Sequence, residues 1–266
     1  MNRFQMIALD VDGTLLTDDH TLLPQTKKTI QTVAKQGAEI VLCTGRSPSS
    51  TIPLMELLEL EGTVITHNGS VTVDTQSREV IHQFVINPAQ LAPYKEYCRD
   101  HGYHFDLNTA FHLYVEDAGI LTEEVLEMYG KFYIEPLVLP KEGEILNEIV
   151  KMTVAGTKEE MDVLEAAWGT WTHELTIIRS GDYFIDIMNP EASKGNALKT
   201  LAYRRGIDVS RVMALGNYYN DITMLQFAGI GIAMENSPIE VKAAADDVAP
   251  SNNEGGVHFA LEKYCL

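Results

Sequence analysis

The chain has 266 residues, of which 45% are hydrophobic and 22% are charged, so it holds enough apolar material for one large or two modest domains. With 38 acidic residues against 20 Lys and Arg, its formal net charge is −18. Such a surface repels the phosphates of nucleic acids and anionic membranes. We therefore expect neither as a partner, and an anionic substrate would need a local positive group.

Targeting and redox patterns place further limits on the protein. The N-terminal residues show no signal-peptide pattern, and no run approaches the 18 apolar residues of a membrane span. The cysteines are Cys43, Cys98 and Cys265, without C-x-x-C or zinc spacing, which suits a reduced setting. We expect a cytoplasmic protein with no membrane partner and no evident obligate protein partner.

Strand and helix patterns alternate through the first part of the chain. Short apolar runs predict buried strands, and segments bounded by Pro and Gly predict helices. In order they are a strand at 6–10, a helix at 24–36, a strand at 39–44, a helix at 48–59 and a strand at 63–66. This alternation predicts a parallel sheet with right-handed crossovers.

The pattern changes after a turn at residues 67–70 and returns near residue 194. Between these points, short strands near 71–84 lead into a mixture of helices (88–101, 157–168) and strands (150–154, 183–187). The later pattern gives helices at 194–205, 221–228, 238–245 and 254–264 and strands at 211–215 and 229–233. We predict an α/β fold with a doubly wound parallel-sheet core, residues 1–83 and 189–266, and an inserted α+β domain, residues 84–188.

The sequence Asp10-Val11-Asp12-Gly13-Thr14 follows directly after the first strand. Ligands of open parallel sheets bind beyond the carboxyl ends of strands. Two carboxylates two residues apart can enter one small site, where one attacks and the other handles a proton. An isolated D-x-D-G is also typical of a turn with Asx hydrogen bonds. A calcium loop is excluded, because it needs Gly at the sixth position and Glu at the twelfth, where this chain has Leu15 and Thr21.

Four separated motifs, each at a predicted strand end or helix start, carry a family resemblance. They are residues 10–14, Thr44-Gly45-Arg46, Ser193-Lys194-Gly195 and the segment 216–221, Gly-Asn-Tyr-Tyr-Asn-Asp. With these motifs in this order, the chain resembles the phosphatases of the haloacid dehalogenase (HAD) superfamily, most of all the Cof-type branch with a type II cap. The resemblance implies a Rossmann-like HAD core and makes residues 84–188 a lid that selects the substrate.

The resemblance also implies a role for each motif. Asp10 would be the nucleophile, forming an aspartyl-phosphate, and Asp12 the general acid and base. The phosphate would contact Val11, Thr44, Gly45, Lys194 and Asn220, and Mg²⁺ would be held by Asp10, Asp12, Asn217 and Asp221. For Asp12 the expected ligand is the main-chain carbonyl, and Asp221 is expected to orient the lysine or metal-bound waters.

Position 217 departs from the family pattern, which usually has an aspartate that binds magnesium directly. An amide oxygen can still bind Mg²⁺ but brings no charge, so we expect weaker metal affinity than in relatives with Asp at this position. Lys194, in the first turn of a predicted helix, would supply the fixed positive charge that an anionic substrate needs.

The expected activity is the magnesium-dependent hydrolysis of small phosphorylated metabolites, such as sugar phosphates. One alternative is a phosphomutase, which shares the nucleophile but returns the phosphate to the substrate. Another is a phosphometabolite sensor that binds without turnover, which only Asn217 favours. The candidates for leaving-group contact within the inserted domain are His112, Tyr114, Arg179, Asp182 and Tyr183.

Overall fold

The computed structural model describes residues 3–117, 135–139, 148–180 and 182–266, together with the separate positions 121, 123, 126, 129 and 130. Contacts within the chain divide it into two compact units. The core unit consists of Met1–His82 and Ser193–Leu266, and the cap unit consists of Gln83–Ala192. The sequence patterns place these borders after residues 83 and 188.

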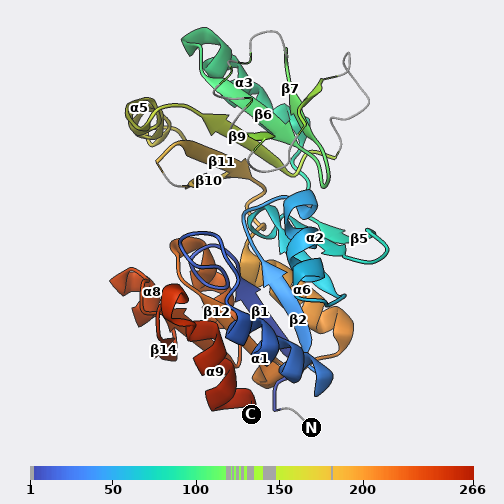
Figure 1. The fold of residues 1–266 in the computed structure, drawn as a ribbon. Coiled ribbons are helices and arrows are strands. Elements are labelled where there is room, and N and C mark those ends of the chain that lie inside the picture. Colours follow the sequence, from blue (N-terminus) through green and yellow to red (C-terminus); the bar gives the residue numbers. More distant parts are fainter. Residues whose placement is uncertain are drawn as a thin grey trace. The chain divides into compact units, whose positions relative to one another are not determined.

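The core unit is built on a mostly parallel sheet (Figure 1). Its strands are β1 (Met6–Asp10), β2 (Glu39–Cys43), β3 (Thr63–Thr66), β4 (Val71–Asp74), β5 (Val80–Gln83), β12 (Val212–Gly216), β13 (Ile230–Met234) and β14 (Asp247–Ala249). They lie in the order β14-β13-β12-β1-β2-β3-β4-β5. Neighbouring strands from β14 to β3 are parallel, whereas β4 runs antiparallel to β3.

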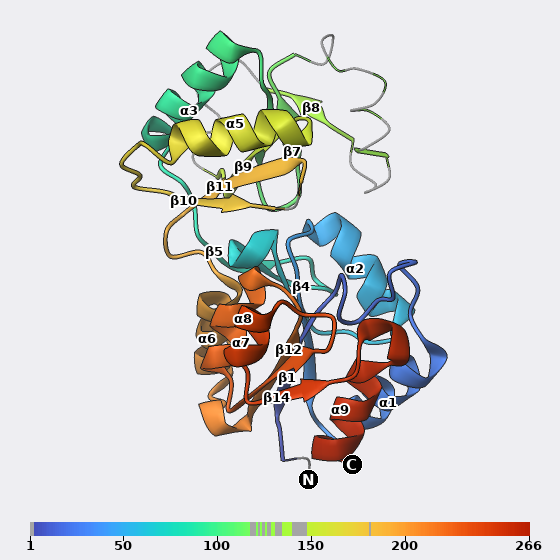
Figure 2. The ribbon, with the colours of Figure 1, turned by 90° about the vertical axis from the view of Figure 1, so that its left-hand side faces the viewer.

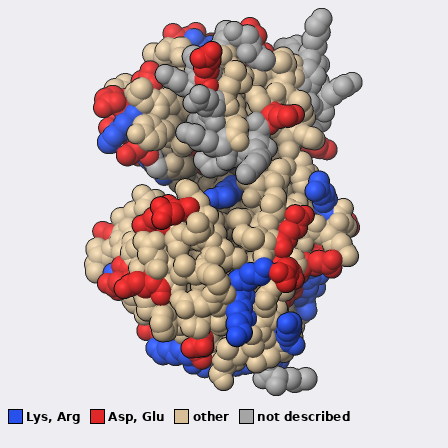
Figure 3. Space-filling view, in the orientation of Figure 1, with Lys and Arg blue, Asp and Glu red and all other residues tan. Residues whose placement is uncertain are grey.

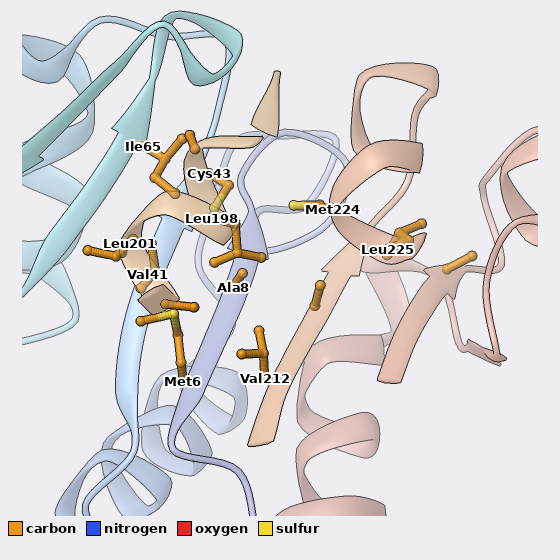
Figure 4. Close-up of a cluster of buried hydrophobic side chains, with 14 of the residues drawn as sticks. Met6, Ala8, Val41, Cys43, Ile65, Leu198, Leu201, Val212, Met224 and Leu225 are labelled. Carbon is orange, nitrogen blue, oxygen red and sulfur yellow. The ribbon is translucent and has the colours of Figure 1, made fainter. Parts of the chain in front are cut away.

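Helices cover both faces of this sheet, as Figure 2 shows. One layer contains α1 (Pro24–Lys35), α2 (Pro48–Leu57) and α9 (Gly256–Cys265), and the other contains α6 (Lys194–Arg205), α7 (Ile222–Phe227) and α8 (Ile239–Ala243). Alternate residues of each strand face opposite layers. Met6 and Ala8 of β1 therefore pack with Leu198 and Leu201 of α6 (Figure 4). This arrangement confirms the predicted doubly wound α/β core.

The strand order reverses its direction at β1, which lies between β12 and β2. From β1 the chain first builds the sheet outward through β2 and β3, and later outward through β12, β13 and β14. Such a switch point leaves an opening at the carboxyl ends of its strands. Here the three ends are Asp10, Thr44 and Asn217, each the last residue of its strand or the one after it. The strand order therefore brings these three motifs to the same edge of the sheet.

The cap unit has its own sheet and its own hydrophobic cluster. Its described strands are β6 (His104–Asn108), β7 (Leu113–Val115), β8 (Leu137–Val138), β9 (Lys151–Ala155), β10 (Thr176–Arg179) and β11 (Phe184–Met188), in the order β10-β11-β9-β6-β7-β8. Helices α3 (Pro88–His101) and α5 (Lys158–Trp168) pack on one face, around Leu107, Met152, Ile187 and the buried Trp168. This confirms the predicted α+β insertion, although the sequence patterns do not predict β6, β7, β8 or β10, nor β14 in the core unit.

The strongly acidic composition is visible on the face of the molecule that Figure 3 draws. Figure 3 shows acidic side chains scattered over one face of both units. In the part of the chain that the structure describes, no helix is both long enough and apolar enough to cross a membrane.

Candidate active site

Three charged side chains meet in the interior at the carboxyl end of β1. Lys194 Nζ lies 2.7 Å from Asp10 Oδ1 and 2.6 Å from Asp221 Oδ1. Asp10 is 5% exposed, Lys194 1% and Asp221 0%. Buried charges are tolerated only when they are paired and hydrogen-bonded. The lysine therefore neutralises one of two carboxylates, and the trio keeps a net negative charge when all three groups are ionised.

The start of α6 fixes the position of Lys194. Ser193 is the N-cap residue, and its hydroxyl accepts a hydrogen bond from the Asn196 N–H. The turn between β3 and β4 packs closely against this helix end, because a Cβ on Gly69 would lie 2.2 Å from the carbonyl carbon of Ser193. Gly69 also has a φ of +98°, which glycine adopts without strain. Local backbone chemistry thus aims the lysine at β1.

The surroundings shift the pKa of both members of the central ion pair. Burial raises the pKa of Asp10 to about 7, the charge of Asp221 adds to this, and Lys194 opposes it. For Lys194, burial alone would lower the pKa, but the charges of Asp10 and Asp221 outweigh it and the pKa rises. Lys194 therefore stays protonated, while full ionisation of Asp10 at neutral pH would be favoured by a further cation.

Both oxygens of Asp221 already have donors. Oδ1 accepts from Lys194, and Oδ2 accepts from the main-chain N–H groups of Asn217 and Tyr218 at 2.8 and 2.9 Å. A Cβ on Gly216 would lie 2.5 Å from the Asp221 Cβ, so the close turn needs glycine there. Asp221 thereby fixes the loop that carries Asn217, and these contacts suit an orienting role.

Asn217 brings its side chain next to Asp10 and Asp12. One atom of its amide lies 3.0 Å from Asp10 Oδ2, 3.0 Å from the Asp12 carbonyl oxygen and 3.2 Å from Thr14 Oγ1. Gly13 leaves room for the other amide atom, since a Cβ there would lie 2.4 Å from Asn217 Nδ2. Three of the residues predicted to hold a metal are therefore within contact distance of one another.

This set of atoms fits a hard cation. Among the described residues, no three His, Cys, Asp or Glu side chains form a group that could hold a metal. A cation site here therefore has to use amide and main-chain oxygens as well. A carboxylate, a carbonyl and an amide oxygen are ligands that Mg²⁺ accepts, usually together with water.

Asp12 forms an ion pair that the sequence interpretation missed. Arg46 Nε lies 2.8 Å from Asp12 Oδ2, and Arg46 Nη2 lies 2.5 Å from Oδ1. This bidentate contact holds a half-exposed carboxylate in one orientation. Arg46 belongs to the Thr44-Gly45-Arg46 motif at the end of β2, next to β1. The adjacency of the two strands was the signal that could have paired them.

The predicted phosphate-binding residues lie around the same strand ends. Thr44 is buried, and its Oγ1 accepts from the Arg46 N–H at 3.2 Å. A Cβ on Gly45 would lie 2.9 Å from Asn68 Oδ1, and the same oxygen accepts from Asn220 Nδ2 at 3.0 Å. Asn68, with a φ of 56°, therefore links two motifs. The sequence patterns placed it only in a turn.

The main chain of Val11 completes the loop after β1. Its carbonyl accepts from the Leu16 N–H at 3.0 Å, and its side chain is buried. Further along, Asn252 donates to the Leu16 carbonyl at 3.0 Å and to Asp18 at 2.9 Å. The loop that carries Asp12 is thus held by a segment more than two hundred residues away in sequence.

The cap unit contains a second buried charge cluster, which the sequence interpretation also missed. Asp106 and Asp186 are each 3% exposed, and Lys151 Nζ lies 3.3 Å from Asp186 Oδ1. Asp106 and Asp186 both pair with Thr153 in the sheet register, on the face opposite Trp168. Burial raises the pKa of Asp106 to about 6, against the opposing effect of Lys151.

The five candidates for contact with the leaving group lie in the cap unit, and their surroundings differ. Arg179 contacts Asp162 at 3.1 Å and Glu165 at 3.5 Å, both on α5. Tyr114 is buried, whereas Tyr183 and Asp182 are exposed. His112 donates its main-chain N–H to Thr109 Oγ1 at 3.2 Å. These contacts do not single out one of the five residues as a substrate contact.

Comparison with known proteins identifies the family. A family model described as "haloacid dehalogenase-like hydrolase" matches residues 7–261. "Putative phosphatase M6_Spy0533" of Streptococcus pyogenes serotype M6 is 32% identical, covering 98% of both chains. "5-amino-6-(5-phospho-D-ribitylamino)uracil phosphatase YwtE" of Bacillus subtilis is 26% identical, covering 97% of this chain and 96% of that protein. The solved structure of the HAD subclass IIB sugar phosphatase BT4131 has a TM-score of 0.81 at 24% identity, covering 98% of both chains.

The chain therefore belongs to the haloacid dehalogenase superfamily, in its Cof-type phosphatase branch.

Proposed function

We propose that this phosphatase hydrolyses small phosphate monoesters, such as sugar phosphates, through an aspartyl-phosphate on Asp10, with Mg²⁺ as cofactor. The observation that carries the proposal is the setting of the Asp10 carboxylate. Its Oδ1 is bound by Lys194, and its Oδ2 lies 3.0 Å from the Asn217 amide atom that is also 3.0 Å from the Asp12 carbonyl oxygen. This is a nucleophile held between a fixed cation and a set of cation ligands.

In the first step, the Asp10 carboxylate attacks phosphorus as the bond to the leaving alcohol breaks. Asp12 gives its proton to the leaving oxygen. In the second step, Asp12 takes a proton from water, which attacks the phosphorus and restores the Asp10 carboxylate. A proton on Asp12 removes the charge that binds Arg46 on both oxygens. The ion pair between Arg46 and Asp12 therefore has to loosen when Asp12 acts as an acid.

Asp10 Oδ2, the Asp12 carbonyl oxygen and the Asn217 amide oxygen would hold Mg²⁺, with Asp221 orienting the loop of Asn217. When bound, the cation would supply positive charge to the nucleophile and to the phosphate oxygens.

The remaining residues would bind the phosphate. Lys194 stands at the N-terminus of α6, where the helix dipole also favours an anion. The Thr44 hydroxyl, the Gly45 and Val11 N–H groups and the Asn220 amide would donate to the phosphate oxygens. Together they would attract the substrate phosphate locally, in a chain whose net charge is −18.

We further propose that the cap unit acts as the lid, excludes water during the reaction and selects the leaving group. The substrate class is supported by two relatives, because the names of YwtE and BT4131 each specify a small phosphorylated metabolite or sugar phosphate. The three cysteines form no disulfide, which suits a reducing compartment such as the cytoplasm.

The test is phosphate release from a panel of sugar phosphates and other phosphorylated metabolites, with and without Mg²⁺. We expect turnover of several monoesters that EDTA abolishes and Mg²⁺ restores. Stoichiometric binding of a monoester without release of inorganic phosphate would instead support the sensor that Asn217 favours. Magnesium-independent release would contradict the proposed cofactor while leaving the activity in place.

A further inference from the structure

One atom of the Asn217 amide has only oxygen neighbours at close range. They are Asp10 Oδ2 at 3.0 Å, the Asp12 carbonyl oxygen at 3.0 Å and Thr14 Oγ1 at 3.2 Å. Carboxylate and carbonyl oxygens can only accept hydrogen bonds. We call this atom the inward amide atom. Whether it is nitrogen or oxygen therefore depends on whether a cation is bound next to the three oxygens.

Without a cation and with Asp10 ionised, an inward amide oxygen would lie 3.0 Å from two other acceptors with no hydrogen between them. An inward NH₂ group instead donates to Asp10 Oδ2 and to the Asp12 carbonyl at normal hydrogen-bond length. Asp10 is buried, so a donor to its second oxygen is worth more than it would be at the surface. The metal-free site therefore favours nitrogen inward.

With Mg²⁺ present, the preference is reversed. Ligands at about 2.1 Å in an octahedron are separated by about 3.0 Å along each edge. The inward amide atom has this separation from both Asp10 Oδ2 and the Asp12 carbonyl. An inward oxygen would thus lie at the spacing of neighbouring magnesium ligands from each of these two oxygens.

Two neighbouring residues accept either orientation of the amide. The Thr14 hydroxyl, 3.2 Å from the inward atom, can donate to an oxygen or accept from a nitrogen. Gly13, with a φ of +76°, leaves space for the outward atom, because a Cβ would lie 2.4 Å from it. Gly13 and Thr14 can therefore stay in place when the amide makes a half-turn.

We propose that Asn217 is an amide switch, whose NH₂ group takes the place of the cation in the metal-free protein and whose oxygen binds Mg²⁺ after a half-turn. The magnesium half of this switch rests on the proposed function, whereas the metal-free half does not. Mg²⁺ has to displace two hydrogen bonds and binds only the inward-oxygen state. Its apparent affinity is therefore its affinity for that state multiplied by the fraction of the protein in that state. In return, the nucleophile stays oriented when no metal is bound. An aspartate at 217 could do only one of these two tasks.

The direct test is the side-chain NH₂ signal of Asn217 in the full-length protein labelled with ¹⁵N-asparagine, assigned by its loss in Asn217→Asp. In EDTA we expect its two protons to be well separated in shift and slow to exchange. On titration with Mg²⁺, both features should be lost as the NH₂ group turns outward. An unchanged Asn217 signal, while other signals report Mg²⁺ binding, would overturn the switch alone. No response of any signal to Mg²⁺ would overturn the switch together with the proposed cofactor.

Thermal unfolding without substrate gives a second test, which does not depend on catalysis. In EDTA, Asn217→Asp should lower Tm by several degrees, because three acceptors then face one another. In Mg²⁺ its Tm should equal or exceed that of the wild type, with half of the rise reached at a tenfold lower Mg²⁺ concentration. Equal Tm values for the wild type and Asn217→Asp in EDTA would contradict the switch.

The matched control is Asn87→Asp in the cap unit. It makes the same chemical change and adds the same charge, while Asp can keep the N-cap hydrogen bond that Asn87 accepts from the Ala89 N–H. Its Tm should follow that of the wild type in EDTA and in Mg²⁺. If Asn217→Asp does not fold, the NMR titration of the wild type still decides the question.

Discussion

In the part of the chain that the structure describes, each unit places one lysine next to a pair of buried aspartates, but the carboxylates are satisfied in different ways. In the core unit, Lys194 Nζ lies within 2.7 Å of both Asp10 and Asp221. In the cap unit, Lys151 lies 3.3 Å from Asp186, and neutral donors supply the other contacts. Those donors are Asn108 and Tyr129 for Asp106, at 2.6 and 3.0 Å, and Thr153 and Ser180 for Asp186, at 2.9 and 2.5 Å.

This difference fits the proposed catalytic role of the core cluster and a structural role of the cap cluster. Hydroxyl and amide donors satisfy buried carboxylates without adding charge, so the cap cluster needs no further ligand. The core cluster uses a fully buried lysine, and the second oxygen of Asp10 lies 3.0 Å from the Asn217 amide. A buried carboxylate beside potential cation ligands is an arrangement typical of a functional site.

The largest effect should come from Asp10→Asn, which removes the proposed nucleophile but keeps its shape. An amide cannot form the acyl phosphate, so we expect phosphate release to fall by about a thousandfold or more. Far-UV circular dichroism should be unchanged. The matched control is Asp106→Asn, for which kcat on a small aryl phosphate should stay within about threefold. Comparable losses in the two variants would remove the distinction between the clusters.

A second test removes the lysine from each cluster. Lys194→Met leaves two buried carboxylates facing each other and should lower the free energy of unfolding by about 3–5 kcal/mol. Lys151→Met leaves Asp186 with Thr153 and Ser180 and should cost about 1–2 kcal/mol. Urea unfolding followed by calorimetric Tm values measures both. A larger loss for Lys151→Met would mean that the cap cluster depends on charge after all.

The third prediction concerns the pH dependence of the cap cluster. Burial raises the pKa of Asp106 from 3.8 in the unfolded chain to about 6. The native state therefore holds this proton more tightly, and the stability that this gives below pH 4 is lost as the pH rises through 6. Asp106→Asn cannot titrate, so wild type should lose on the order of 2–3 kcal/mol relative to this variant between pH 4 and pH 7. A pH-independent difference would show that Asp106 keeps an ordinary pKa.

Much of this architecture could be predicted from the sequence, because the signals were local. The apolar run before Asp10, the Pro24 and Pro48 helix starts and the strand patterns each depend on neighbouring residues alone. The short strands β6, β7 and β14 could not, because pairing with distant strands stabilises them rather than their own sequence pattern.

For the candidate site, the sequence predicted residues but not their contacts. Lys194 and Asp10 are 184 positions apart, and only the α6 start and the β1 end bring them to 2.7 Å. The contact between Arg46 and Asp12 depends on which strands are neighbours, a fact that no local pattern contains. The cap cluster was missed for a further reason. Asp106 and Asp186 become buried only because of what covers their face of the sheet, and polar residues at alternate strand positions normally indicate a solvent-exposed face.

The smallest expected effect comes from removing one of the two units altogether. If Gln83–Ala192 is replaced by a short Gly/Ser linker, the core unit should still fold, because its hydrophobic cluster and the trio of Asp10, Lys194 and Asp221 contain no residue of the cap unit. In the proposed mechanism, attack on a small aryl phosphate uses residues of the core unit alone. Selection of a sugar phosphate needs contacts to the leaving group, which we assign to the cap unit. The ratio of kcat/KM for a sugar phosphate over the aryl phosphate should therefore fall by about tenfold, equivalent to about 1.4 kcal/mol of discrimination. Asp10→Asn in the shortened chain checks that the remaining release comes from the same nucleophile. A ratio that survives the deletion would place substrate selection in the core unit, and the cap unit would then have no part in it.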